Sequence, residues 1–355
     1  MSQEKPDRRF AAAEGRRFLS DALAAASLPA ADAEAVAAMM LLADLRGIDS
    51  HGIVRLSGYI ERIAAGGINP NPVIRVASDA PAVALVDGDN AMGHLVMRFA
   101  AELAIEKARK TGVAWVGTRR SNHAGAAACY AMMPLAADMI GLYLAVANNN
   151  HMAPWGGIEA LLGTNPIAVA VPTLNEPPIV LDIATTATSA GKIKLAADDR
   201  QRLAEGLVMD RAGNPITDPA KAGEGLMLPI GGYKGYGLSL MFSLLAGVLN
   251  GAATGRDTTS IDDAAAQGST GQAIMALDVA RFGPVTDFKR SVDKVVRDLR
   301  SSRPLPGGPP VRYPGLEGHR TAAARQAGGI PIRAPFVAAL ARLAAELAIA
   351  PLALL

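Results

Sequence analysis

The feature that most constrains the fold is an alternation of helix-like and strand-like hydrophobic patterns that starts near residue 95. Residues 95–110 have the spacing of an amphipathic helix, 113–118 form a short strand-like run, and 126–138 return to a helical pattern. Further strand-like runs lie at 140–148, 166–172, 178–185 and 272–280, and a long buried helix is predicted at 235–251. Alternation of this kind predicts helices layered on a sheet, that is, an α/β fold.

The segments on either side of this region are mostly helical in pattern. Residues 9–46 predict two Ala-rich helices separated at residues 27–29, and 51–65 predict a third, while 82–88 alternate as a strand does. A surface loop is expected at 252–271, and a Pro/Gly-rich linker at 303–315 precedes more helical sequence. The last 21 residues are apolar but contain Arg342 and Glu346, so they predict a docking helix and not a membrane anchor.

Composition narrows the class of protein. The chain has 355 residues, a formal net charge of +2 and no basic stripe, which argues against nucleic-acid binding. Its one cysteine, Cys129, excludes an internal disulfide and fits a reducing compartment. The N-terminal stretch lacks the apolar core of a signal peptide. These observations predict a soluble, cytoplasmic protein.

The stretch GIDSHGIVRL, residues 47–56, carries the chemistry that we consider first. Ser50 is a good N-cap residue, which would make His51 the first residue of a helix and place Arg55 one turn later on the same face. Arginine matches a carboxylate through two hydrogen bonds, and the helix dipole and Arg55 would both keep His51 neutral and able to accept a proton. The pair therefore predicts a small 2-hydroxy or 2-oxo acid as substrate. The alternative is an ordinary helix cap with a solvated arginine.

Three other motifs suit a nucleotide. TRRSNHAGAAA (118–128) places His123 and the amides of residues 124–127 beyond a strand, where ligands bind in open α/β sheets. Asp182 ends a strand and is suited to accept from a ribose hydroxyl, and Lys234 lies in a glycine-rich turn suited to a phosphate. Helix capping explains the His123 motif equally well, and for Asp182 a cap of the next helix is the more common event. No G-x-G-x-x-G occurs, so a standard Rossmann fingerprint is absent.

Evidence for a metal site is thin. The five histidines are isolated in the sequence, and no H-x-x-x-H or C-x-x-C occurs. Asp49 with His51 is the one pair that suggests a metal-dependent hydrolase, which we keep as an alternative from another class. We predict no metal.

Six motifs, taken in order, resemble the malate/L-lactate dehydrogenase family of NAD(P)-dependent oxidoreductases that lack a Rossmann fold. They are GIDSHGIVRL, SNHAG, APWGG, GTNPIAVAVP, LDIAT and GGYKGYGLSLMFSLLAGVL, and the resemblance covers residues 10–332. It implies a homodimer with a non-Rossmann α/β cofactor-binding domain and a mostly helical domain built from both termini. We therefore expect an N-terminal helical and substrate segment at 1–95, the cofactor domain at 96–305, and C-terminal helices at 306–355 that pack back on the first segment.

The resemblance also implies roles for individual residues. His51 is expected to transfer the proton with Ser50 as its partner, Arg55 to bind the substrate carboxylate and Thr164 to lie near the substrate; in one branch of the family the loop histidine, His123, is the acid/base instead. The residues expected at NAD or NADP are His123, Ala124, Gly125, Ala126, Ala127, Asp182, Ile183, Ala184, Lys234, Gly315, Leu316 and Glu317. The family also includes cyclic-imine (piperideine and pyrroline carboxylate) reductases, so such a reductase is an alternative function. Ala124, His151 and Gln272 depart from the family pattern and leave the substrate open.

Overall fold

The computed structural model describes residues 8–355, and its centre is a seven-stranded sheet with the order β2-β3-β4-β10-β5-β6-β7. The strands are β2 (Arg75–Asp79), β3 (Val83–Ala91), β4 (Val113–Ser121), β5 (Met139–Ala145), β6 (Ile167–Val171), β7 (Ile179–Ile183) and β10 (Thr270–Asp278). Only β3 and β4 pair in parallel, and the other neighbours are antiparallel. The predicted α/β layering is confirmed.

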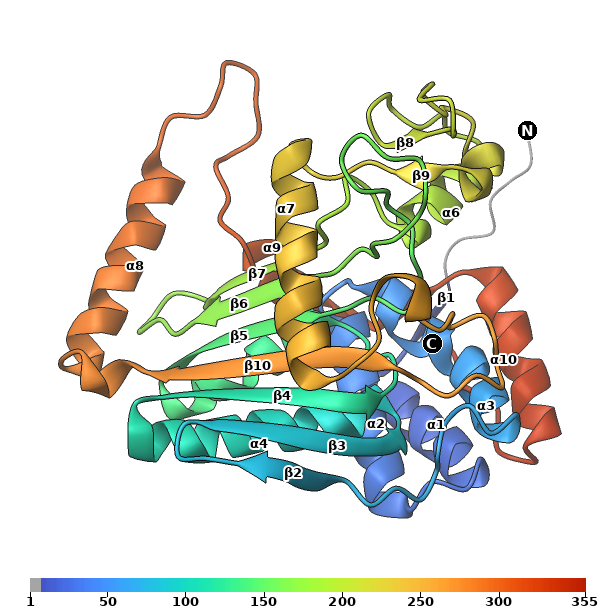
Figure 1. Cartoon of the computed structure of the whole chain (residues 1–355), viewed down its shortest axis with the longest axis horizontal. Coiled ribbons are helices and arrows are strands. Elements are labelled where there is room, and N and C mark those ends of the chain that lie inside the picture. Colours follow the sequence, from blue (N-terminus) through green and yellow to red (C-terminus); the bar gives the residue numbers. More distant parts are fainter. Residues whose placement is uncertain (1–7) are drawn as a thin grey trace.

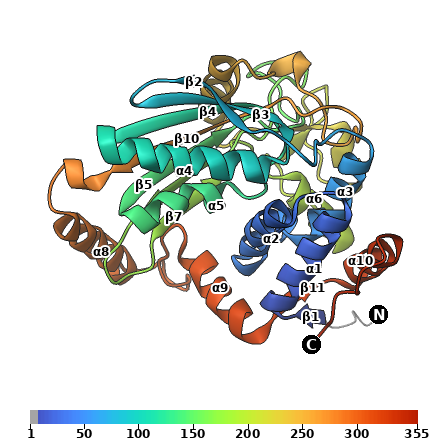
Figure 2. The same ribbon diagram turned by 90° about the horizontal axis from the view of Figure 1, so that it is seen from below.

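Helices α4 (Gly93–Thr111) and α5 (Ala127–Ala131) cover one face of this sheet (Figure 2). Their contacts with the strands are made largely by alanine, for example Ala100, Ala104 and Ala108 of α4, all of which are fully buried. Alanine brings helix and sheet backbones close together. Pro134 follows α5 in a 3₁₀ turn (Met133–Ala137), which ends the helix that the sequence predicted over 126–138.

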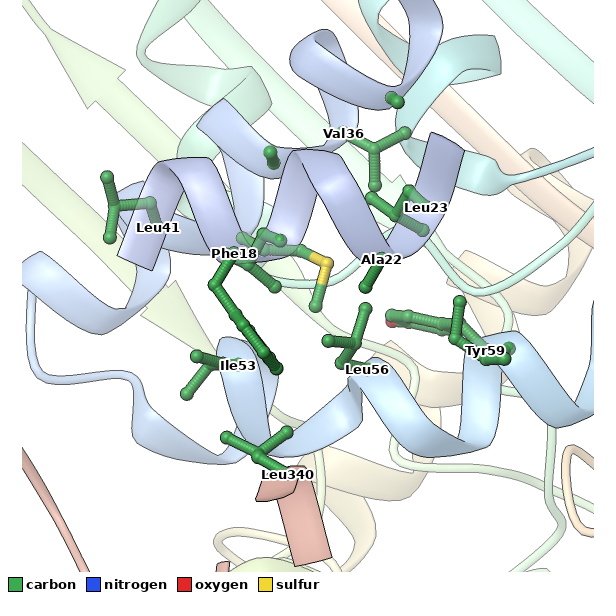
Figure 3. Close-up of a cluster of buried hydrophobic side chains, with 14 of the residues drawn as sticks. Phe18, Ala22, Leu23, Val36, Leu41, Ile53, Leu56, Tyr59 and Leu340 are labelled. Atoms are coloured by element: carbon green, nitrogen blue, oxygen red, sulfur yellow. The ribbon is translucent and has the colours of Figure 1, made fainter. Parts of the chain in front are cut away.

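A second core joins the two ends of the chain. Helices α1 (Ala12–Ala25), α2 (Ala30–Leu45) and α3 (Leu56–Ala64) pack with α10 (Ala334–Glu346), and β1 (Arg8–Phe10) pairs with β11 (Ile330–Ile332). Figure 3 shows Phe18, Ile53 and Leu56 around Leu340 in this core. The predicted helical unit built from both termini is confirmed. Strands β2 and β3, which precede residue 95, belong to the sheet.

The helix predicted at 235–251 is confirmed in its extent, but it is buried on one side only. Helix α7 spans Tyr233–Phe242 and continues through a π-helical turn (Ser243–Gly247) and a 3₁₀ turn (Val248–Asn250). It runs across the front of the sheet in Figure 1. Apolar side chains along it are exposed in the single chain, including Leu249, which is 65% exposed.

The remaining elements were not predicted, apart from the helical sequence expected near the C-terminus. They are α6 (Ala190–Asp198), β8 (Val208–Met209), β9 (Leu226–Met227), α8 (Val285–Ser301) and α9 (Leu316–Gly328). Helix α8, at the left of Figure 1, packs beside the β6–β7 hairpin through buried Val296 and Asp293 and leads into the predicted linker, which has no regular structure. Among residues 8–355, none of the helices has the length and apolar character needed to cross a bilayer.

Candidate active site

A pocket of about 300 Å³ lies at the end of the sheet where β4 and β5 end and β6 and β10 begin. Because neighbouring strands here are antiparallel, strand ends and strand starts alternate along one edge and bring together segments distant in sequence. The predicted residues that line this pocket are Ser50, His51, Arg55, His123, Ala124, Gly125 and Thr164. Other lining residues that the sequence did not single out as ligand-binding include Tyr143, Asn149, Ser189, Gly191 and Asp262.

The turn that carries His51 differs from the predicted helix start. Two 3₁₀ turns, Asp49–His51 and Ile53–Arg55, precede α3, and Ser50 does not cap a helix. The break falls at Gly52 because the carboxylate of buried Asp44 fills the space of a Cβ there and accepts the Ile53 N–H at 2.8 Å. The prediction that a helix dipole at Ser50 assists anion binding is therefore wrong. His51 and Arg55 nevertheless line the same pocket.

His51 has a neutral imidazole near pH 7. Ser50 Oγ lies 2.8 Å from His51 Nδ1, so Nε2 is the nitrogen left for a ligand. Burial, followed by the positive charge of Arg55, lowers the pKa of His51 to about 4. The expected neutral imidazole is confirmed, although burial is the main cause and not the dipole.

A second imidazole, His123, stacks on the first with ring centroids 5.5 Å apart and planes inclined by 26°. The hydroxyl of Tyr59 lies 2.6 Å from His123 Nδ1, and the Gly125 N–H also points at this nitrogen at 3.3 Å. Burial raises the pKa of the Tyr59 phenol, so it remains a donor. Two donors on Nδ1 place the proton of the neutral ring on Nε2. Burial, with the nearby His51 and Arg55, holds the pKa of His123 well below its usual value.

Tyr59 and His94 extend this cluster and were missed at the sequence level. Tyr59 lies four residues after Arg55, which in turn lies four after His51, so this spacing was an available signal. Figure 3 shows the Tyr59 ring at one edge of the helical core. His94 meets that ring edge to face at 5.4 Å, is buried, and has no hydrogen-bond partner for either ring nitrogen among residues 8–355. Burial lowers its pKa to about 3.

Arg55 presents its charge to the pocket. Its Nε donates to the Ser50 carbonyl at 2.7 Å, and its terminal nitrogens form no hydrogen bond or ion pair with the described part of the chain. A guanidinium fixed at Nε with two free nitrogens is suited to bind a carboxylate in a bidentate manner.

Small residues in the wall of this pocket allow a ligand to lie close to the backbone. Gly125 has φ of +70°, and a Cβ there would lie 2.7 Å from His94 Nε2. Ala124 lines the wall beside it, and Gly191, in the first turn of α6, lies against Ser50. A flat ligand such as a nicotinamide ring fits the chemistry of a wall built from backbone and methyl groups.

The other residues predicted at the cofactor lie outside the pocket lining. Ala126 and Ala127 lead into α5, and Asp182 on β7 accepts the Ala128 N–H at 2.9 Å. Ile183 ends β7 and Ala184 follows it, Lys234 lies in the first turn of α7, and Gly315, Leu316 and Glu317 begin α9. Partial loss of hydration raises the pKa of the Asp182 carboxyl to about 6, against the opposing effects of the Ala128 N–H and Arg46, although part of the residue is exposed.

Backbone contacts connect these segments to the pocket. The Thr185 N–H donates to Thr164 at 2.9 Å, and the Ile230 N–H donates to Thr185 at 2.9 Å. At the other end of β7, the Val180 N–H donates to Pro314 at 3.0 Å. The predicted cofactor residues thus lie along β7 and the segments beside it, at increasing distance from the pocket. Their roles remain predictions.

The proposed Asp49–His51 metal pair does not form. Asp49 makes an ion pair with Arg325 through both carboxylate oxygens, and the His51 Nδ1 faces Ser50. Within residues 8–355, no group of three or more His, Cys, Asp or Glu side chains is placed to hold a metal ion.

Comparison with known proteins shows the family of this chain. The family model described as "Malate/L-lactate dehydrogenase" matches residues 10–341. The chain belongs to this family. It is 38% identical to the malate dehydrogenase of Pyrococcus horikoshii, over 89% of each chain.

Two solved structures of the same family extend the comparison. The sulfolactate dehydrogenase of Methanocaldococcus jannaschii superimposes with a TM-score of 0.89 at 36% identity, covering 96% of this chain and 98% of that one. The delta1-piperideine-2-carboxylate reductase of Pseudomonas syringae does so with a TM-score of 0.83 at 29% identity, covering 94% and 99%. The likeness therefore spans the whole fold and includes proteins named for different substrates.

Proposed function

We propose that this chain is an oxidoreductase that transfers a hydride between NAD or NADP and a small 2-hydroxy or 2-oxo acid. The observation that carries this proposal is the neutral imidazole of His51 in one pocket with the unpaired guanidinium nitrogens of Arg55. A 2-hydroxy acid presents a carboxylate and a hydroxyl on adjacent carbons, which matches this pair of side chains.

The chain's own residues handle the carboxylate and the proton. Arg55 binds the substrate carboxylate and so fixes the orientation of the neighbouring carbon. His51 Nε2 accepts the hydroxyl proton as the C–O bond becomes C=O, and the hydrogen on the same carbon leaves with its electron pair. Ser50 holds the ring through Nδ1. In the reverse direction the imidazole returns the proton to the oxygen.

NAD(P), when bound, accepts this hydride or supplies it in the reverse direction. Ala124 and Gly125 give a nicotinamide ring access to the pocket, since neither has a side chain beyond a methyl group. We propose that the adjoining residues Ala126, Ala127, Asp182 to Ala184, Lys234 and Gly315 to Glu317 hold the rest of the dinucleotide. His123, with the Tyr59 hydroxyl on its Nδ1, is the second candidate for proton transfer.

We also propose that the protein is a homodimer. The apolar face of α7 and the turns after it supports this, because Leu238, Met241, Leu245, Val248 and Leu249 are each more than 40% exposed in the single chain. An exposed apolar stripe of this kind is typical of an interface. A cytoplasmic location is part of the same proposal, supported by the single, buried Cys129.

The test is a screen of substrates against NAD and NADP, followed by nicotinamide absorbance. The panel contains 2-hydroxy acids, 2-oxo acids and cyclic imine carboxylates. We expect turnover of a 2-hydroxy acid or its oxo partner. Turnover of a cyclic imine alone would establish the second candidate function, which the likeness to the piperideine carboxylate reductase supports. No turnover with any of them, together with no change in NADH or NADPH fluorescence on mixing, would contradict the proposal.

A further inference from the structure

The loop at 258–269, which we call the mouth loop, forms part of the pocket although its sequence predicted only a surface excursion. Ile261 and Asp262 line the main pocket and also an adjoining pocket of about 210 Å³. Arg55 lines both as well, so a substrate held by Arg55 has the mouth loop beside its distal end.

The mouth loop is fixed in place by a buried arginine of α3. Arg62 is 5% exposed and donates to the carbonyl oxygens of Ile261 at 3.2 Å, Ala266 at 2.7 Å and Asp263. The Ile261 N–H donates in turn to Asn149 Oδ1 at 3.1 Å. Asp262 is therefore held at a defined position at the pocket.

Only one oxygen of the Asp262 carboxylate accepts hydrogen bonds from the described part of the protein. Asn149 Nδ2 donates to its Oδ2 at 2.9 Å, and Ser260 donates to the same oxygen at 3.4 Å. Among residues 8–355 neither a hydrogen bond to Oδ1 nor an ion pair to this carboxylate is present. One anionic oxygen at the pocket is thus free to accept from a ligand.

The remaining charges of the two pockets leave no place for a second anion. Arg55 is the only lysine or arginine among the described residues that line the main pocket. Burial lowers the pKa of His51, His123 and His151, so these rings are neutral near pH 7. In the adjoining pocket the terminal nitrogens of Arg62 already donate to loop carbonyl oxygens, to Gly67 and to Asn122. Glu61 places a second carboxylate in the same pocket.

We propose that Asp262 selects 2-hydroxy acids whose distal group donates N–H bonds, such as an amide, a ureido group or an ammonium, and discriminates against a second anionic group. This inference rests on the proposed function, because Arg55 must hold the 2-carboxylate for the distal group to reach Asp262. A distal carboxylate or sulfonate would face Asp262 with no free cation to neutralise it, and like charges in such contact weaken binding. The preference is thus opposite to that expected of an enzyme for malate or sulfolactate, whose distal groups are anionic.

The experiment compares malate with its half-amide, 2-hydroxysuccinamate, which has nearly the same shape but replaces the distal O⁻ with NH₂. We expect kcat/KM of the wild type to favour the half-amide by about tenfold or more. Asp262→Asn should reduce this ratio at least about tenfold, because the amide no longer repels the anion. Asp257→Asn, an exposed acid just before the mouth loop, is the matched control and should leave the ratio unchanged.

The outcomes separate the two proposals. Preference of the wild type for malate, or an unchanged ratio in Asp262→Asn, overturns the role of Asp262 while turnover itself still supports the hydride-transfer function. A ratio that shifts equally in Asp257→Asn would show a general charge effect and would also overturn the specific role. No turnover of these acids, of lactate or of ureidoglycolate with either cofactor would overturn both proposals.

Discussion

Two segments bring polar groups to the pocket, the turn at 49–55 and the mouth loop at 258–269, and each is held in place by one buried ionisable side chain. Asp44 holds the turn by accepting the Ile53 N–H, whereas Arg62 holds the mouth loop by donating to carbonyl oxygens. The turn lies against the helical core through Ile53 and Leu56, both nearly fully buried, while Asp262 and Asp263 of the mouth loop are exposed. In our proposals, the segment anchored in the buried core carries the proton transfer and the exposed segment the choice of substrate.

The largest expected effect is on catalysis and comes from the turn at 49–55. His51→Ala should lower kcat/KM by about 10²–10⁴-fold, because it removes the group that accepts the proton. Steady-state rates on the best substrate measure this, with His319→Ala, an exposed histidine of α9, as the control. If His51→Ala keeps the wild-type rate and His123→Ala loses it, the proton transfer belongs to His123.

The second prediction breaks the anchor of the mouth loop. Arg62→Met should lower the free energy of unfolding by about 3 kcal/mol, since three partly buried carbonyl oxygens of the mouth loop lose their donor. It should also raise KM more than it lowers kcat, because the loop carries binding and not proton transfer. Chemical unfolding and steady-state kinetics test both points, with exposed Arg303→Met as the control. A fall in kcat with no change in KM would contradict the assignment of binding to the mouth loop and of proton transfer to the turn at 49–55.

A third, smaller effect is expected at the residue that both pockets share. Arg55→Lys should raise KM by about tenfold or more with a lesser change in kcat, because one ammonium does not replace the two parallel hydrogen bonds of the guanidinium. Initial rates over a range of substrate concentrations measure this. A variant whose KM is unchanged would show that the carboxylate binds elsewhere.

The smallest effect on catalysis concerns the anchor of the turn, where the expected change is in stability. Burial raises the pKa of Asp44 to about 8, so the folded protein keeps a proton that the unfolded chain releases above about pH 4. The contribution of Asp44 to the free energy of unfolding is therefore greatest below pH 4. It falls by about 1 kcal/mol for each pH unit as the pH rises towards 8. Asp44→Asn should flatten this dependence relative to the wild type. Chemical unfolding at several pH values between 5 and 8 tests it, and parallel curves for the two proteins would refute the role of Asp44.

Sequence patterns predicted the parts of the fold that depend on local periodicity. The helices at Ala12–Ala25, Ala30–Leu45 and Gly93–Thr111 and the central strands lie close to their predicted positions, because one face of each must be buried. Helix α7 was misjudged for the same reason. Its apolar side chains indicate burial, but a single chain leaves them exposed.

The site was predicted in part. Ser50, His51, Arg55, His123 and Thr164 were identified from motifs, and the structure places them around one pocket. The helix expected to start at Ser50 does not form, because Asp44 from the preceding helix occupies the space beside Gly52. That contact spans eight residues and is not visible in any local pattern.

By itself, the sequence determined the α/β layering, the helical unit formed by both termini and the residues that we propose bind the acid and accept its proton, since these depend on periodicity and on ordered motifs. Only the tertiary structure brought Tyr59 to His123, His94 to Tyr59, and Asp262 to the pocket that Arg55 lines. The physical reason is that protonation states and substrate charge preference depend on burial and on neighbours from distant segments, and both arise only when the chain is folded.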